Sequence, residues 1–585
     1  MEKRWIIKES GEEKVINNLS NKLNINKVLA NLLVQRGITS FEEARKFFRP
    51  SLKDLHDPFL MLNMDKAVER IRQAIINQEK ILIYGDYDVD GTTSVALVYS
   101  FLKQFYSQVD FYIPDRYKEG YGISKQGIDH AYKENATLVV ALDCGIKAVD
   151  KIEYANEKNI DFIICDHHLP GDKLPEAVAI LDPKQESCKY PYKELSGCGV
   201  GFKFMQALAH DQNIPFEKLE PCLDLVAISI AADIVEIKGE NRILAYYGLK
   251  KLNSNPRPGI ESILKYSKIV RHYDKESKKN VFDKELTISD LVFTIAPRIN
   301  AAGRIANGKK SVELLNCKQA KGADKIAEGI DKYNKERRNL DMQITEQALS
   351  IIAEDSFLQK SKSTVVYHNN WHKGVLGIVA SRLTEVYYRP TIVLSLIDNM
   401  YTGSARSVKG FNIYAAIDSC KDLLENFGGH PFAAGLSIKK ENIDAFVERF
   451  ETYVDKHLKV SMMSPEIMID SQLEINQISD KFFNILKQFA PFGPGNMSPI
   501  FLTKNAWDTG YAKIVGEKHL KFRLGNPNRN TTGFDAIAFG QADKLNIVKN
   551  GDFDLCYTID ENVWRGNTNL QLMVKDIKTD KNTVN

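Results

Sequence analysis

Three carboxylates, Asp86, Asp88 and Asp90, follow the apolar run at residues 81–84 and are separated by single residues. Like charges this close in sequence repel one another, and a bound cation offsets that repulsion more completely than solvent does. The spacing therefore predicts a divalent metal site. It favours metal-dependent chemistry on a phosphorylated substrate.

The same residues also fit the opening of an EF-hand calcium loop, with Gly91 at its sharp turn. The twelfth position of that loop should be a bidentate Glu, but it is Leu97. The preceding run is rich in β-branched residues, whereas an EF-hand needs an amphipathic helix there. These differences argue against a calcium loop and leave a purely structural acidic turn as the other alternative.

Two further apolar runs also end in side chains that could bind metal. Because the functional crevice of an open parallel sheet lies outside the carboxyl ends of its strands, we expect these side chains to converge. The potential ligands that follow the runs are Asp143, Asp166, His167 and His168. The predicted strands are residues 81–84, 109–114, 138–142, 161–165 and 177–183.

The donor types indicate the kind of metal. Neutral imidazole and carboxylate oxygens suit Mn²⁺ or Mg²⁺, whereas thiolates favour zinc or iron–sulfur centres. The eight cysteines show no CxxC spacing, so we interpret them as small buried hydrophobic residues in a reducing compartment.

Composition limits the class of protein. The N-terminus carries charges where a signal peptide needs an apolar region, and no run of eighteen apolar residues occurs, so we expect a soluble cytoplasmic protein. A net charge of +3 is only mildly basic, so any nucleic-acid path should be a local groove.

A chain of 585 residues should form several domains. Charged residues with spaced apolar positions over 321–354 predict a long helix, and short alternating strands after residue 465 predict an OB-fold barrel. The overall prediction is an α/β protein. Its parts are a helical cap (1–60), a parallel-sheet catalytic domain (61–240), a helical region with the connecting helix (241–354), a second α/β domain (355–460) and the barrel (461–585).

Aromatic and basic residues of the barrel could stack on bases and contact phosphates, although each aromatic could equally belong to the core. These residues are Phe501, Lys513, His519, Lys521, Phe522, Arg523 and Trp564.

Several Gly-rich segments could approach a ligand closely. We predict GSARS, with Ser404 and Arg406, as a short turn that grips phosphate, and GGHPFAAG places His430 among small residues. The alternative for GSARS is a tight strand-to-helix turn. We predict APRINAAGR as a loop whose arginines contact phosphate or cap a helix, and GCGVG as a packing turn.

Taken together, the motifs GDYDVDG, LDCG, DHH and IAAD resemble the four metal-site motifs of the DHH phosphoesterase superfamily. Flanking segments, among them IPDRYKEGYG, APRINAAGR, GSARS, GGHPFAAG and APFGPGN, resemble the RecJ family of single-strand-specific 5′→3′ exonucleases. The resemblance runs from about residue 30 to about residue 575.

The resemblance implies two metal ions, Mn²⁺ or Mg²⁺, that support in-line attack of water on phosphorus without a covalent nucleophile. Asp143 would bridge the metals, and Asp86 would be either a ligand or a partner of one. The implied metal residues are Asp86, Asp88, Asp90, Asp143, His167 and Asp233.

The implied catalytic residues are His168, which would face the scissile phosphate, together with Asp166 and Arg298. Positions expected to hold the 5′-phosphate are Arg116, Ser404 and Arg406, and further substrate contacts are His430, Asn300 and Arg304. The family also implies single-stranded DNA as the substrate, a helicase and a single-strand-binding protein as partners, and a role in DNA repair and recombination. A self-contained chain with these parts favours a monomer.

Three other functions compete with this one. A phosphodiesterase for oligoribonucleotides or cyclic dinucleotides needs only the two α/β parts, and a pyrophosphatase needs no barrel. A non-catalytic scaffold or single-strand-binding protein would be expected to lose metal ligands, but the whole set is present.

Overall fold

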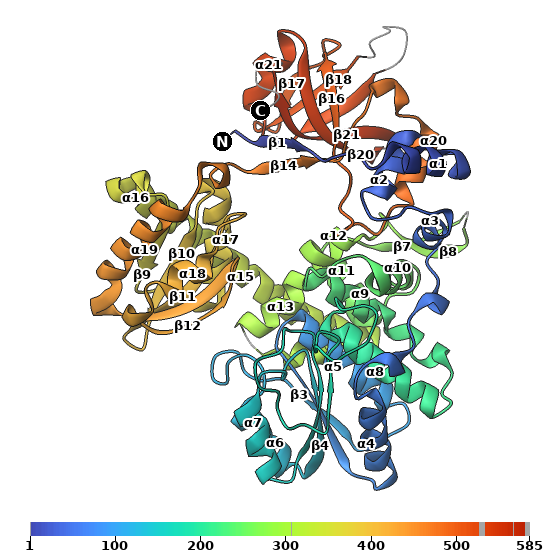
Figure 1. Ribbon diagram of the computed structural model, residues 1–585, viewed down its shortest axis with the longest axis vertical. Coiled ribbons are helices and arrows are strands. Elements are labelled where there is room, and N and C mark those ends of the chain that lie inside the picture. Colours follow the sequence, from blue (N-terminus) through green and yellow to red (C-terminus); the bar gives the residue numbers. More distant parts are fainter. Residues whose placement is uncertain (1, 276, 306, 526–532, 565–566, 580–585) are drawn as a thin grey trace. The chain divides into compact units, whose positions relative to one another are not determined.

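The computed structural model describes residues 2–275, 277–305, 307–525, 533–564 and 567–579 (Figure 1). The chain forms two compact units. Unit 1 comprises Met1–Phe48, Asn339–Phe489 and Ser498–Asn585, and unit 2 comprises Arg49–Arg338 and Ala490–Met497. In the part of the chain that is described, no helix has the length and apolar character needed to cross a membrane.

Unit 2 is built on a parallel five-stranded sheet of order β3-β2-β4-β5-β6, and all four of its ladders are parallel. Its strands are β2 (Lys80–Gly85), β3 (Val109–Tyr112), β4 (Ala136–Leu142), β5 (Asp161–Cys165) and β6 (Ala179–Leu181). The predicted strands and the α/β class are therefore confirmed. A separate antiparallel pair consists of β7 (Arg271–Asp274) and β8 (Lys279–Phe282).

Side chains alternate between the two faces of this sheet, and both faces are covered. Leu138, Val140 and Leu142 of β4 join a core with helices α4, α5 and α8, whereas Val139 and Ala141 join a core with α6 and α7. A strand buried on both faces is nearly continuous in apolar residues, which is why these strands are visible in the sequence.

The helices of unit 2 have two placements: some, such as α6 and α7, lie beside the strands, and others, such as α10 and α11, lie beyond one end of them (Figure 1). They are α4 (Met64–Ile76), α5 (Val89–Leu102), α6 (Lys125–Lys133), α7 (Val149–Glu157), α8 (Gly197–Asp211), α9 (Leu223–Ala232), α10 (Gly239–Ser254), α11 (Pro258–Tyr266), α12 (Ile288–Asp290), α13 (Ala296–Ile305) and α14 (Lys309–Leu315). The long helix α15 (Ala320–Glu354) confirms the predicted helix and contributes residues to both units.

Unit 1 contains a second α/β sheet of order β12-β13-β11-β10-β9. Its strands are β9 (Thr364–His368), β10 (Thr391–Ile397), β11 (Met400–Arg406), β12 (Leu424–His430) and β13 (Ala433–Lys439). GSARS lies in the interior strand β11, so its prediction as a short turn is wrong. A Cβ on Gly403 would lie 1.9 Å from the carbonyl oxygen of Val393, so this glycine permits close strand pairing and does not form a turn.

The C-terminal part of unit 1 is a seven-stranded sheet of order β15-β16-β20-β21-β19-β18-β17. Its strands are β15 (Ser471–Gln472), β16 (Phe501–Ala506), β17 (Lys513–Val515), β18 (His519–Leu524), β19 (Phe534–Ala538), β20 (Phe553–Trp564) and β21 (Asn567–Lys578). Among the described residues no ladder joins β15 to β17, so the predicted barrel is an open sheet there.

In β18 the basic residues Lys521 and Arg523 are partly exposed and alternate with buried Leu520 and Phe522. Phe522 and Phe501 are core residues, as the alternative for the aromatics anticipated. The side chain of Trp564 lies outside the described residues.

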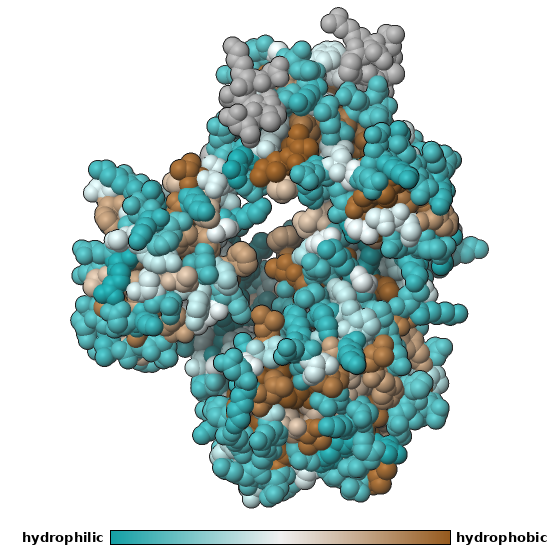
Figure 2. Space-filling view, in the orientation of Figure 1, coloured by the Kyte–Doolittle hydropathy of each residue, from teal (hydrophilic) through white to brown (hydrophobic). Residues whose placement is uncertain are grey.

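The N-terminal segment contains a strand that the sequence analysis missed. β1 (Arg4–Ile7) pairs in parallel with β14 (Glu466–Ile469), and the indole of Trp5 donates to the Asp576 carboxylate at 2.9 Å. The remaining helices of unit 1 are α1 (Glu13–Leu23), α2 (Lys27–Val34), α3 (Phe41–Phe48), α16 (Ser356–Lys360), α17 (Leu376–Tyr387), α18 (Ile413–Asp418), α19 (Ile443–His457), α20 (Asp480–Lys487) and α21 (Leu545–Lys549). Polar side chains cover most of the visible surface, and apolar ones appear in separate groups (Figure 2).

Candidate metal centre

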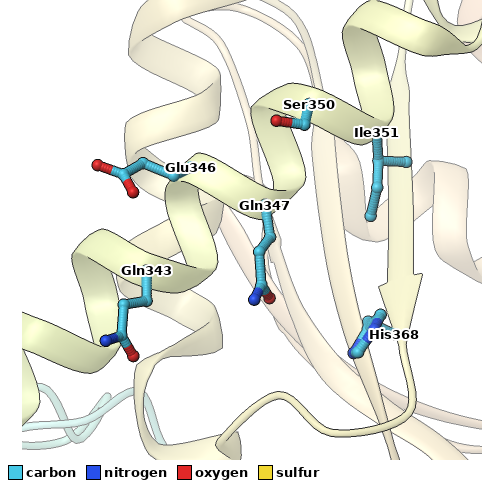
Figure 3. A pocket seen from close by; sticks show the side chains of 6 residues that line it. All are labelled: Gln343, Glu346, Gln347, Ser350, Ile351 and His368. Carbon is cyan, nitrogen blue, oxygen red and sulfur yellow. The ribbon is translucent and has the colours of Figure 1, made fainter.

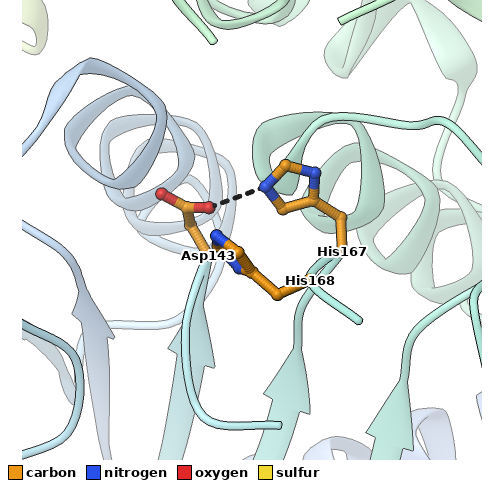
Figure 4. Close-up of side chains that lie close together, drawn as sticks. All are labelled: Asp143, His167 and His168. Atoms are coloured by element: carbon orange, nitrogen blue, oxygen red, sulfur yellow. Dashed lines mark ion pairs between the residues drawn. The ribbon is translucent and has the colours of Figure 1, made fainter. Parts of the chain in front are cut away.

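The carboxyl ends of three neighbouring strands of unit 2 bring the predicted ligands together. Asp86 follows β2, Asp143 follows β4, and His167 and His168 follow β5. Figure 4 shows Asp143, His167 and His168 beside one another above the strands. Ligand atoms of these three residues lie within 4.8 Å of one another, and so do those of Asp90, His167 and Asp233. Both groups could hold a metal ion.

His167 is the member that the two groups share. Its Nε2 atom lies 3.1 Å from Asp143 Oδ1, 3.6 Å from Asp233 Oδ2 and 3.7 Å from Asp90 Oδ2. Both ring nitrogens are buried and neither has the geometry of a hydrogen bond. Burial lowers the pKa of His167, which favours the neutral imidazole that binds metals. An unbonded, buried nitrogen facing three carboxylates fits a metal ligand.

Asp90 is held by hydrogen bonds from two helices. Its Oδ2 accepts from Gly197 N at 2.7 Å, and its Oδ1 accepts from Cys198 N at 2.8 Å and Ser229 Oγ at 2.7 Å. Gly197 and Cys198 open α8 with Ser196 as N-cap, so this carboxylate lies at the positive end of a helix. A carboxylate offers about four acceptor positions, so Oδ2 retains one for a cation.

Asp86, Asp143 and Asp233 resist ionisation. Burial and the charge of Asp88 raise the pKa of Asp86 to about 8, and burial and the charges of Asp90 and Asp88 raise that of Asp233 to about 8. Burial and the charges of Asp90 and Asp88 raise the pKa of Asp143 well above its ordinary value. A divalent cation would reverse these shifts, because opposite charge favours the ionised form.

Asp143 also adopts an unusual backbone conformation, with φ of 60°. Gly197 packs against it, and a Cβ at position 197 would lie 2.7 Å from Asp143 Cβ and 2.8 Å from Asp143 Oδ1. The first residue of α8 must therefore be glycine if this carboxylate is to keep its position.

Asp166 orients His168 and, among the described residues, belongs to neither group that could hold a metal ion. His168 Nδ1 lies 2.7 Å from Asp166 Oδ1, and since a carboxylate only accepts, the ring donates here. Although burial opposes it, the hydrogen bond from His168 and others from the backbone lower the pKa of Asp166 to about 2. Although burial favours the neutral ring, Asp166 raises the pKa of His168. The His168 ring thus uses Nδ1 to hold Asp166, which leaves Nε2 for a ligand.

Tyr121 is a residue that the sequence analysis did not name. Its hydroxyl lies 3.2 Å from His168 Nε2 and 3.4 Å from the Asp143 carbonyl oxygen. The flanking residues Gly120 and Gly122 have φ of 85° and 78°. The sequence signal was the GYG triplet, because paired glycines permit the left-handed backbone on both sides of the tyrosine.

APRINAAGR is helical, so its prediction as a loop is wrong. It forms α13, which continues directly from a π-helix at Leu291–Ile295, so Pro297 lies inside a continuous helical segment. Arg298 lies in α13 and pairs with buried Asp331 of α15 at 3.1 Å, which makes its visible role structural. Asn300 and Arg304 lie on the same helix and are partly exposed.

Arg116 also lies in unit 2, near the carboxylates. Its guanidinium stacks over the ring of Tyr87 at 4.9 Å, and its charge favours the ionised form of Asp86. Tyr87 separates Asp86 from Asp88 in the sequence, so this arginine belongs to the surroundings of the candidate metal centre.

In unit 1, Ser404 and Arg406 lie on one face of β11 beside the start of α17. A Cβ on Gly377, the second residue of that helix, would lie 2.8 Å from the Arg406 guanidinium and 3.3 Å from Ser404 Oγ. Among the described residues no carboxylate pairs with Arg406, whose guanidinium donates to the Ala405 carbonyl. A hydroxyl, an unpaired guanidinium and a helix N-terminus form a suitable site for an anion.

The remaining predicted residue, His430, is exposed at the end of β12 and pairs with Ala433 across the hairpin to β13. Gly429 needs to be glycine, since its φ is 146° and a Cβ would lie 2.4 Å from the Ala433 carbonyl oxygen. The small residues around His430 therefore permit the tight hairpin between β12 and β13.

A cavity of about 490 Å³ lies elsewhere in unit 1 (Figure 3). It is lined by α15 and the end of β9, and none of the predicted residues lines it. The lining residues are Gln343, Glu346, Gln347, Ser350, Ile351 and His368.

Comparison with known proteins agrees with this arrangement. The model of the DHH family N-terminal domain matches residues 80–230, that of the DHHA1 domain matches 360–456, and that of the RecJ OB domain matches 469–576. The class is therefore that of DHH-family enzymes that carry a DHHA1 and an OB domain.

The single-stranded-DNA-specific exonuclease RecJ of Bacillus subtilis is 37% identical over 577 residues, which cover 98% of this chain and 70% of that protein. The chain belongs to the RecJ family. RecJ from Thermus thermophilus, solved with Mn²⁺, has the same fold, with a TM-score of 0.83 at 24% identity over 99% of this chain and 80% of that one. An exonuclease RecJ bound to manganese matches at 27% identity with a TM-score of 0.58, over 70% of this chain and 99% of that one.

Gly197→Ala tests the packing of α8 against Asp143. We expect the added methyl group to displace the carboxylate and to weaken Mn²⁺ binding by about 10–100-fold, the usual effect of disturbing a ligand's support. Calorimetric titration with Mn²⁺ measures the affinity, with Gly201→Ala in the same helix as the control. A Cβ at 201 would meet only methyl groups, at 3.3 and 3.4 Å. Equal affinity in all three proteins would contradict the role given to Gly197.

Proposed function

We propose that this chain is a metal-dependent exonuclease that removes nucleotides from the 5′ end of single-stranded DNA, in DNA repair and recombination. The observation that carries the proposal is His167, whose buried and unbonded nitrogen faces three carboxylates in a chain of the RecJ family. The relatives that support it are described as specific for single-stranded DNA.

The proposed metal ligands are Asp86, Asp88, Asp90, Asp143, His167 and Asp233, with Mn²⁺ or Mg²⁺ as the cations. Asp143 lies closest to His167 and is the proposed bridge. Asp88 also stabilises the fold, because its Oδ1 caps α5 by accepting from Gly91 N at 3.0 Å. Two cations bound there would activate water and stabilise the leaving oxygen of the phosphodiester.

The protein's own residues then position the substrate. His168, oriented by Asp166, offers Nε2 to a phosphate oxygen and stabilises the charge that develops on it. The Tyr121 hydroxyl lies beside that nitrogen. When a phosphate binds there, the hydroxyl would either move away or donate a hydrogen bond to the same phosphate. Arg298, through Asp331, would hold α13 against α15 so that Asn300 and Arg304 can contact the strand.

The proposed 5′→3′ polarity of cleavage depends on recognition of the 5′-phosphate. In the proposal Ser404 and Arg406 of unit 1 bind this group with the first turn of α17, and His430 of the same unit adds a further contact. Arg116 of unit 2 is proposed separately as a phosphate contact beside the carboxylates. The guanidinium of Arg406 supports this assignment, because no carboxylate of the described residues pairs with it and its charge is available to a phosphate.

The remaining parts of the proposal concern the domain division, the oligomeric state, the partners and the location of the protein. The division into five parts and a monomeric state rest on the organisation of the sequence. A helicase and a single-strand-binding protein as partners are carried over from the family. A cytoplasmic location is supported by the eight cysteines, which are all free in the described chain.

The experiment that tests the function uses single strands labelled at the 5′ or the 3′ end, with Mn²⁺ or Mg²⁺. We expect the 5′ label to be released first. Asp143→Ala should abolish cleavage while leaving single-strand binding nearly unchanged, and exposed Asp110→Ala is the matched control. Release of the 3′ label first would refute the polarity, and normal cleavage by Asp143→Ala would refute the metal bridge.

Arg406→Ala tests the phosphate site separately. We expect kcat/KM for 5′-phosphorylated strands to fall by about 10–100-fold, as for loss of a charge-assisted hydrogen bond worth about 1.5–3 kcal/mol, and kcat/KM for 5′-hydroxyl strands to change little. Arg449→Ala is the control, because Arg449 is an exposed arginine of the same unit that pairs with Asp422. An equal loss on both kinds of end would show that Arg406 does not read the 5′-phosphate.

A further inference from the structure

Ile234 has a backbone conformation that its side chain disfavours. It directly follows Asp233, the C-cap residue of α9, and its φ is 59°. In this left-handed region a Cβ crowds the following carbonyl, and β-branched residues are the least tolerant of it. Helices that end in this way usually place glycine or asparagine there.

The rest of the chain follows that rule. Among the described residues with positive φ, other than glycine, asparagine is the most frequent and Ile234 is the only β-branched one. The strain is therefore a local exception and not a general property of this fold.

Packing does not compensate for the strain. Ile234 is 64% exposed, whereas the next residue, Val235, packs against the core of unit 2. An exposed isoleucine gains little from burial, so two unfavourable features coincide at one position. Strained residues that persist without packing are concentrated at functional sites.

The position of Ile234 connects it with the candidate metal centre. Consecutive Cα atoms are about 3.8 Å apart, so Ile234 lies one residue from a proposed ligand. The carboxylate of that ligand, Asp233, lies 3.6 Å from His167 Nε2. Ile234 is therefore an exposed apolar residue directly next in the chain to a proposed metal ligand.

We propose that Ile234 packs against a base next to the scissile phosphate, and that its strained conformation is retained for this contact. The inference rests on the proposed nuclease function and adds a residue that positions the substrate. An apolar face of this kind accepts every base, as an exonuclease without sequence preference requires.

The test compares Ile234→Gly and Ile234→Val with a matched control, Lys268→Gly. Lys268 has φ of 63°, is exposed, and follows the C-cap of α11 as Ile234 follows that of α9. Glycine relieves the backbone strain at both positions, so we expect both Gly variants to keep or raise the melting temperature.

Steady-state kinetics on 5′-phosphorylated single strands then separate the variants. For Ile234→Gly we expect kcat/KM to fall about tenfold, mainly through KM, as for loss of one apolar contact. Ile234→Val and Lys268→Gly should stay within about twofold of the wild type. With abasic residues at the first two positions of the strand, the tenfold difference between wild type and Ile234→Gly should disappear.

Three results would overturn the inference. These are wild-type kinetics for Ile234→Gly, a defect that persists on the abasic strand, or a melting temperature lowered by more than about 3 °C, which would make Ile234 a packing residue. Absence of single-strand cleavage by the wild type would instead refute the nuclease function, on which this inference depends.

Discussion

The hydrogen bonds that Asp90 accepts from α8 and α9 are the constraint on which the candidate metal centre depends. This one carboxylate, carried by α5, binds the first two N–H groups of α8 and the hydroxyl of Ser229 in α9. α8 in turn places Gly197 against Asp143, and α9 ends at Asp233. Helix α5 is thereby tied to α8 and α9, which come about a hundred residues later in the chain, at the same edge of the sheet.

The same arrangement has an electrostatic cost. Burial and mutual repulsion raise the pKa of Asp86, Asp143 and Asp233, so the centre without cations is a poor place for so many negative charges. Asp166 is the exception, because His168 and backbone donors stabilise its charge. The protein itself thus stabilises the charge of Asp166. The charges of Asp86, Asp143 and Asp233 would be stabilised by a cation.

Much of this could be predicted from the sequence, for a clear physical reason. Strands buried on both faces are continuous apolar runs, and ligands at their carboxyl ends must converge, so the positions after β2, β4 and β5 were recognisable. The long helix α15 was equally visible through its spaced apolar residues.

The predictions that the structure contradicts concern segments rich in glycine and alanine. Such segments are compatible with more than one kind of secondary structure. GSARS and APRINAAGR suggested a turn and a loop, yet tertiary pairing places them in β11 and α13. GCGVG was interpreted as a packing turn, although SGCG, with serine as an N-cap, begins α8 and supplies the N–H groups for Asp90. Tyr121 and the Arg298–Asp331 pair depend on contacts across the fold, which spacing alone does not reveal.

The most direct test of the proposed two-metal centre is anomalous diffraction from crystals soaked in Mn²⁺. We expect two peaks about 3.5–4 Å apart, both within coordination distance of the Asp143 carboxylate and one beside His167 Nε2. A single peak, or peaks bound away from Asp143 and His167, would contradict the two-metal centre.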